Sequence, residues 1–127
     1  MYRFSAAHRL HVPTLSDAAN QTIYGRCNNP NGHGHTYTLE VTVDGPVDSL
    51  TGMIMDRGAL DQTVQTVLDP LDHTHLDREI PAFHHHPSTA EHLIVYLWNA
   101  LAPRFGRGLA SLRLWETSKN VVAYSQP

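Results

Sequence analysis

The chain has 127 residues, of which 41% are hydrophobic, and a net charge of −3. This length fits a single globular domain, residues 1–127, which buries roughly two-thirds of the surface that the unfolded chain exposes. There is no basic run to favour nucleic acid or an anionic membrane, and no apolar run approaches the roughly 18 residues of a membrane span. We therefore expect a cytoplasmic protein, without a signal peptide, that acts on a small molecule.

Ten histidines and one cysteine are the unusual features of the composition. A single cysteine forms no internal disulfide, so Cys27 is a buried structural thiol, a metal ligand or a reactive group. The run from His84 to His86 precedes Pro87 and is typical of an exposed loop. The histidine count alone therefore does not indicate ten functional imidazoles.

The first strand is predicted from alternating apolar positions, which are Tyr2, Phe4, Ala6, His8 and Leu10. His8 lies on the apolar side of this pattern, where a histidine is either a packed core residue or a metal ligand. Residues 11–31 contain turn formers but no periodicity, and they predict a long connection that leads to Cys27.

The segment from Cys27 to His35 precedes a second strand with alternating character between Thr36 and Asp44. His33 and His35 lie on the apolar side of this strand, and side chains two residues apart point to the same face. The alternative is a glycine-rich turn with two exposed histidines. Together with His8, however, three neutral imidazoles could hold zinc and leave a fourth position for water or substrate.

Two helices are predicted next. Asp56 is placed as the N-cap of the first, whose apolar stripe ends before Pro70. Asp72 and His73 follow, either as a functional pair or as solvated loop residues. The second helix begins at the segment Ser88-Thr89-Ala90-Glu91, which fits a capping box and gives Glu91 an ordinary structural role.

The chain ends in a predicted hairpin in which Leu112, Leu114 and Glu116 share one face. A carboxylate on an apolar face is costly unless it has a partner, so Glu116 is a candidate binding residue. The element order is β-β-α-α-β-β. It predicts an α+β fold in which helices cover one face of an antiparallel sheet.

Six separated segments of this sequence resemble the 6-pyruvoyl-tetrahydropterin synthase family. They are 4–10, 27–37, 51–53, 70–73, 88–91 and 115–117. The spacing between Cys27 and the His33-Gly34-His35 motif resembles that of the tetrahydrobiopterin enzymes. The related 6-carboxytetrahydropterin synthases of queuosine synthesis usually have two residues fewer there.

The resemblance implies a T-fold, with a four-stranded antiparallel sheet and two helices in each subunit. Three subunits would join their sheets into a barrel, and two barrels would stack into a homohexamer. It also implies roles for individual residues. Zinc would be held by His8, His33 and His35.

Other residues take their implied roles from the same comparison. Cys27 would accept the proton, with its pKa lowered by the metal and by His73, and Asp72 would complete the relay. Glu116 would anchor the pterin ring. The pterin pocket would be lined by Thr89 and Glu91, with Ala90 in place of a second threonine.

The implied reaction is the zinc-dependent conversion of 7,8-dihydroneopterin triphosphate to 6-pyruvoyl-tetrahydropterin, a lyase reaction that eliminates triphosphate. Two alternatives stay open at this point. One is a 6-carboxytetrahydropterin synthase, which uses the same substrate and metal. The other is a zinc-binding and pterin-binding relative without catalytic turnover.

Overall fold

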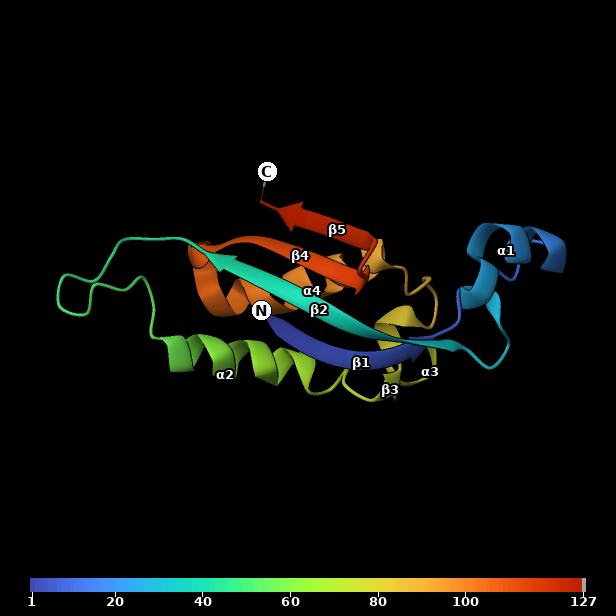
Figure 1. Cartoon of the computed structure of the whole chain (residues 1–127), viewed down its shortest axis with the longest axis horizontal. Helices are drawn as coiled ribbons and strands as arrows, with labels where there is room; N and C mark the ends of the chain where they lie inside the picture. Colours follow the sequence, from blue (N-terminus) through green and yellow to red (C-terminus); the bar gives the residue numbers. More distant parts are fainter. Residues whose placement is uncertain (127) are drawn as a thin grey trace.

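The computed structural model describes residues 1–126, and Figure 1 shows the arrangement of the elements. The strands are β1 (Tyr2–His8), β2 (His33–Val43), β3 (Thr74–His75), β4 (Leu109–Thr117) and β5 (Asn120–Ser125). The α-helices are α1 (Asp17–Tyr24), α2 (Arg57–Leu68), α3 (Leu76–Glu79) and α4 (Ala90–Phe105). Three short 3-10 helices are η1 (Gly25–Asn28), η2 (Pro81–Phe83) and η3 (Gly106–Gly108).

The strands form one sheet in the order β3-β1-β2-β4-β5. β1 pairs with β2, β2 with β4 and β4 with β5, all antiparallel, while β3 pairs with β1 in parallel. The predicted four-stranded antiparallel sheet is therefore wrong by one strand. β3 has only two residues, which pair with Ala6 and Ala7, and a pair of residues is too short for any periodicity to be visible in a sequence.

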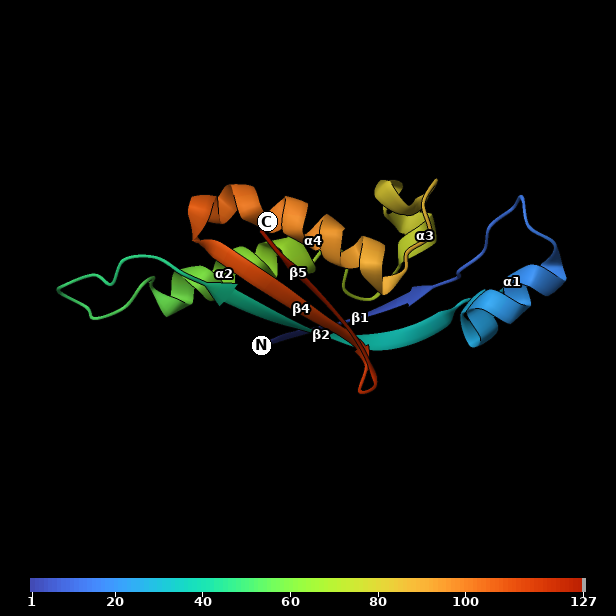
Figure 2. The same ribbon diagram turned by 90° about the horizontal axis from the view of Figure 1, so that it is seen from above.

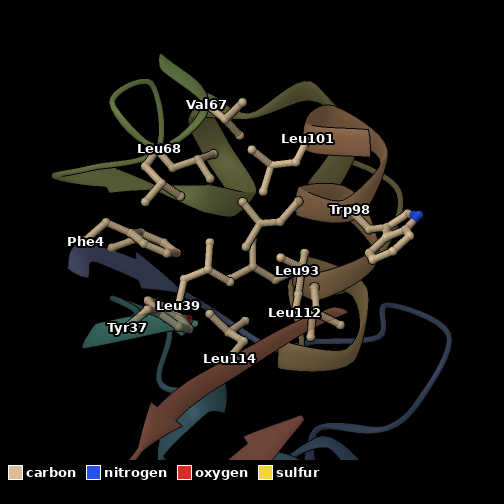
Figure 3. Close-up of a cluster of buried hydrophobic side chains, with 14 of the residues drawn as sticks. Phe4, Tyr37, Leu39, Val67, Leu68, Leu93, Trp98, Leu101, Leu112 and Leu114 are labelled. Atoms are coloured by element: carbon tan, nitrogen blue, oxygen red, sulfur yellow. The ribbon is translucent and has the colours of Figure 1, made fainter. Parts of the chain in front are cut away.

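The helices α2 and α4 lie on the same side of the sheet, as Figure 2 shows. Their apolar side chains meet those of the sheet in the buried core drawn in Figure 3. Phe4 of β1 stacks on Tyr37 of β2 with ring centroids 5.0 Å apart, and both lie under this helical layer. The predicted α+β architecture, with helices on one face, is confirmed.

The prediction of only two helices is also wrong. The expected connection at residues 11–31 contains α1, which begins after the N-cap Ser16. Buried Asn20 stabilises this segment, because its amide nitrogen donates to the carbonyls of Val12, Leu15 and Ser16 at 3.0, 3.3 and 3.1 Å. The helix thus depends on capping and one buried amide rather than on an apolar stripe. The other additional helix, α3, is a single turn.

The starts of the two long helices were predicted with different success. Asp56 caps α2 as expected, and its carboxylate accepts the backbone N–H of Ala59 at 2.9 Å. α4 begins one residue later than a capping box at Ser88 requires, because Thr89 is the N-cap and accepts the N–H of His92 at 3.2 Å. Within residues 1–126, no helix combines the length and apolar character needed to cross a membrane.

Candidate metal centre

Strand register brings the predicted histidines together. His8 at the end of β1 lies opposite His33 of β2, and His35 lies opposite Ala6. Because side chains alternate across a strand, all three imidazoles project from the same face as the core residue Tyr37. The ring centroid of His35 lies 4.9 Å from that of His8 and 4.7 Å from that of His33.

The tautomer of His8 is determined by its neighbour. Its Nδ1 lies 2.9 Å from the backbone carbonyl of Ser88, and a carbonyl only accepts, so Nδ1 carries the proton. The Nε2 lone pair is then directed at Nε2 of His35, 3.1 Å away. A histidine whose second nitrogen donates to a carbonyl is the usual arrangement for a metal ligand. His8 is completely buried, so this orientation is firmly held.

Cys27 and Glu116 complete a group of four. The ligand atoms of His8, Cys27, His35 and Glu116 all lie within 4.8 Å of one another. The Cys27 sulfur is 3.8 Å from Nε2 of His35, and a Glu116 carboxylate oxygen is 3.6 Å from the same nitrogen. Thiolate, imidazole and carboxylate are the groups that bind zinc in proteins. The predicted ligand His33 packs on His35 but does not belong to this group of four.

Glu116 owes its position to an irregular hairpin. The register between β4 and β5 shifts between Trp115 and Thr117, so Glu116 lies at a bulge, a feature that can re-aim a side chain. Its carboxylate accepts a hydrogen bond of 3.5 Å from the amide of Asn120 in the following strand. The residue is only 9% exposed. Within residues 1–126 this carboxylate accepts one long hydrogen bond, so it still has the capacity to accept donors from a ligand.

Burial sets the electrostatics of the cluster. It lowers the pKa of His35 to about 4, with further contributions from His8 and His33, so that the ring is neutral and able to bind a cation at pH 7. Burial, together with the Glu116 carboxylate, raises the pKa of the Cys27 thiol. The lowered thiol pKa that the family resemblance implies would need a cation beside the sulfur, since the surrounding protein raises this pKa.

Tyr37 of β2 is a further group at this site. Its side chain is buried, and within residues 1–126 its hydroxyl has no hydrogen-bond partner. Burial raises the pKa of this phenol well above its usual range, with added contributions from Glu116 and Cys27. A neutral, unpartnered hydroxyl beside the cluster is available to a bound molecule.

The Asp72–His73 pair lies outside the four-residue cluster, although His73 and His35 line the same hollow. The ring of His73 is 3.1 Å from the Asp72 carboxylate, whose other oxygen accepts the Ser5 N–H at 2.8 Å. His73 has a φ of 59°, uncommon for a residue other than glycine, and the hydrogen bond of 2.6 Å from its N–H to the Ser5 carbonyl holds it there. Its side chain is 82% exposed. Within residues 1–126, neither member of the pair is hydrogen-bonded or ion-paired to Cys27.

The predicted pocket residues at the start of α4 have structural roles in this chain. The Thr89 hydroxyl is occupied as the helix N-cap, and Glu91 is exposed in the first turn. The residue that reaches the cluster is their neighbour Ser88, through its carbonyl. Ser88 and Asn120 were missed because their contribution is a contact across the fold, for which the sequence carries no local signal.

Comparison with known proteins agrees with this geometry. The family model described as 6-pyruvoyl tetrahydropterin synthase matches residues 1–127. The chain is 47% identical to the 6-pyruvoyl tetrahydrobiopterin synthase of Poecilia reticulata, over 95% of this chain and 84% of that protein. It is 44% identical to the enzyme of the same name from Drosophila melanogaster, over 98% and 76%.

A solved structure, the Caenorhabditis elegans 6-pyruvoyl tetrahydropterin synthase, superimposes with a TM-score of 0.92 at 39% identity, and the match covers 99% of this chain and 91% of that one. The 6-carboxy-5,6,7,8-tetrahydropterin synthase of Haemophilus influenzae is more distant, at 28% identity over 80% of this chain and 86% of its own length. The matching family model, the whole-length relatives and the superimposed fold agree, and this chain belongs to the 6-pyruvoyl tetrahydropterin synthase family.

Proposed function

We propose that this protein is a zinc-dependent lyase that converts 7,8-dihydroneopterin triphosphate to 6-pyruvoyl-tetrahydropterin and eliminates triphosphate. The observation that carries the proposal is the convergence of His8, Cys27, His35 and Glu116 within 4.8 Å on a chain of this family. The longer spacing between Cys27 and His33 also favours this product over the 6-carboxy product.

The donor groups fit zinc. His8 donates its Nδ1 proton to the backbone carbonyl of Ser88, so its Nε2 can bind a metal, and His35 is neutral at pH 7. We propose that His33 joins them as the third ligand, which leaves Cys27 and Glu116 for the substrate. Zinc would supply a Lewis acid beside the side-chain oxygens of the substrate, where it makes the neighbouring C–H bonds more acidic.

The remaining residues would position the substrate and move protons. The buried carboxylate of Glu116 can accept two parallel hydrogen bonds, one from a ring N–H and one from the adjacent amino group of the pterin. Cys27 would take a proton from the side chain of the substrate at its sulfur, as a general base. Thr89 and Glu91 lie beside Ser88 at the start of α4, and we propose that they line the pterin pocket through backbone groups and the exposed carboxylate.

The exposure of His73 in the Asp72–His73 pair supports an oligomeric site. Within residues 1–126, Cys27 has no hydrogen bond or ion pair to this pair, and the sheet ends in an edge strand on each side, β3 and β5. Free strand edges are commonly covered by pairing with another chain. We propose a cytoplasmic homohexamer in which the pair from one subunit approaches Cys27 of its neighbour. No nucleic acid or membrane partner is part of this proposal.

Product analysis tests the function. The zinc-loaded protein is incubated with dihydroneopterin triphosphate, and the products are identified by mass spectrometry. We expect loss of triphosphate with the three-carbon side chain intact. A 6-carboxy product with release of a two-carbon fragment would assign the chain to the queuosine-type reaction. An unchanged substrate with a zinc-loaded oligomer would favour the non-catalytic binding protein.

A further inference from the structure

A hollow of about 490 Å³ lies beside the metal centre, and none of the four clustered residues lines it. Its volume is within the range of pockets that hold small molecules. Two arginines, Arg9 and Arg78, contribute to its wall together with five histidines, which are His11, His75, His84, His85 and His86. The histidine run that the sequence analysis assigned to an exposed loop thus forms one side of a pocket.

The charge of this pocket favours an anion. Within residues 1–126, neither Arg9 nor Arg78 forms an ion pair with a carboxylate. Asp77 also lines the pocket, but its oxygens are occupied by the Ser88 hydroxyl at 2.5 Å and by the Arg9 backbone N–H. Guanidinium groups match phosphate oxygens in both charge and geometry, and imidazole N–H groups add further donors.

His75 is an unpartnered donor in the wall. Its side chain is 15% exposed, and both ring nitrogens are buried without a hydrogen-bond partner within residues 1–126. The nearest carboxylate oxygen, on Asp77, is 3.9 Å away, beyond hydrogen-bond range. A buried N–H without an acceptor is costly, so a rotation of the ring that brought this N–H to an anion in the pocket would be favourable.

The pocket is joined to the metal centre by a short chain of contacts. Nδ1 of His8 donates to the Ser88 carbonyl, the Ser88 hydroxyl donates to Asp77, and Asp77 accepts the N–H of Arg9. Arg9 also follows His8 directly in the sequence. The anion pocket and the metal ligands are therefore two sides of one structural unit.

The order of the strands indicates which part of the substrate this pocket would bind. From β4 to β3, the sheet carries first Glu116, then His33 and His35, then His8, and last His75 at the pocket. The substrate has the corresponding order, with the pterin ring at one end, the three-carbon side chain in the middle and the triphosphate at the other end. We propose that this pocket binds the triphosphate group of the substrate, an inference that rests on the proposed function.

Inorganic tripolyphosphate is the probe for this pocket. It is titrated calorimetrically into the zinc-loaded protein, with zinc measured before and after so that chelation is separated from binding. The test variants are Arg9→Gln, Arg78→Gln and the double variant. The control is Arg107→Gln in η3, which removes an exposed arginine beyond the far end of the 16-residue helix α4, about 24 Å from its start.

We expect each pocket variant to bind tripolyphosphate about tenfold more weakly, the lower end of the range for a lost hydrogen bond to a charged group, since Arg78 is exposed. Arg107→Gln should bind as the unaltered protein does. The same variants should raise the KM for dihydroneopterin triphosphate by a similar factor. Equal tripolyphosphate binding in the double variant and the control would contradict the proposal that this pocket binds triphosphate.

The kinetic outcomes separate this inference from the proposed function. If the double variant turns over dihydroneopterin triphosphate with an unchanged KM, the proposed function stands and the assignment of this pocket to the triphosphate is wrong. If the unaltered protein never turns over this substrate, the proposed function is wrong and so is the assignment of the pocket to the triphosphate of that substrate.

Discussion

The cluster around His35 and the Asp72–His73 pair contain similar groups in opposite environments. The imidazoles of His8 and His35 are buried, their contacts are provided by strand register and a backbone carbonyl, and they need no other chain to meet. The His73 ring is 82% exposed, and its ion-pair partner within residues 1–126 is its neighbour Asp72. The comparison indicates that one chain assembles the candidate metal site alone, whereas the proposed proton relay would need a contact with Cys27 that the Asp72–His73 pair does not make within residues 1–126.

The largest expected effect is on the catalytic rate of Cys27 and His73 variants. Oligomers that contain both variants test whether the two residues act from different chains. Cys27→Ala and His73→Ala should each retain zinc but lose roughly two to four orders of magnitude in rate, the usual contribution of a positioned acid or base. Coexpression of the two variants should restore activity to about a quarter of normal, because random assembly brings an intact Cys27 next to an intact His73 at one contact in four. No recovery in mixed oligomers would show that both groups act within one chain.

Zinc binding tests whether the centre is complete within the chain. His8→Ala and His33→Ala should each weaken zinc binding more than about 100-fold, since changes in the outer shell alone cost 10- to 100-fold. Glu116→Gln should retain the metal. Competition with a chromophoric chelator measures the affinity. If His33→Ala binds zinc normally while Cys27→Ala does not, the thiol is the third ligand, as the four-residue group suggests.

Glu116→Gln tests the ligand side of the same cluster. The amide replaces one acceptor with a donor that opposes the donors of the pterin. Pterin binding should therefore weaken by roughly 1.5–3 kcal/mol, the range for a hydrogen bond to a charged group. Calorimetric titration with a pterin measures this loss, and Glu40→Gln, on the exposed pair with Arg113, is a matched control. Equal affinity in the two variants would remove Glu116 from the pterin site.

The smallest expected effect is on stability. The pKa of His35 is about 4 in the folded chain against an ordinary value of 6.5. Between these values the unfolded chain binds a proton that the folded chain does not, so the zinc-free protein should lose stability as the pH falls from about 6.5 towards 4. Denaturant unfolding across this range should show a steeper loss than in His35→Gln. The exposed-residue control His85→Gln should keep the steep loss, and equal slopes in all three proteins would contradict the burial argument.

Periodic patterns of apolar residues in the sequence predict the long strands and helices of this molecule. Alternation identified β1 and β2 and placed His8 and His35 on a shared face, and the apolar stripes found α2 and α4 because each repeats over several turns. The same reasoning missed α1 and β3, since the first depends on the buried amide of Asn20 and the second on two residues alongside Ala6.

The candidate site likewise has features that the sequence predicts and features that it does not. Its residue types were visible in the sequence, but the contacts of Ser88, Asn120 and Tyr37 depend on segments that meet only in the folded chain. The exposure of His73 could not be predicted either, because the motif that contains it is the same whether its partner lies in the same chain or in another. His33 stays a predicted ligand.

The bulge at Glu116 has a consequence for how the hairpin tolerates change. The carboxylate contacts Asn120, which lies just after the turn at Ser118 and Lys119, so the length of that turn sets where the acid is directed. An inserted residue would leave the pairing of Leu112 with Tyr124 possible, yet it would displace the acid's partner by one position. Loop grafting at this hairpin would therefore redirect the Glu116 carboxylate before it changed whether the protein folds.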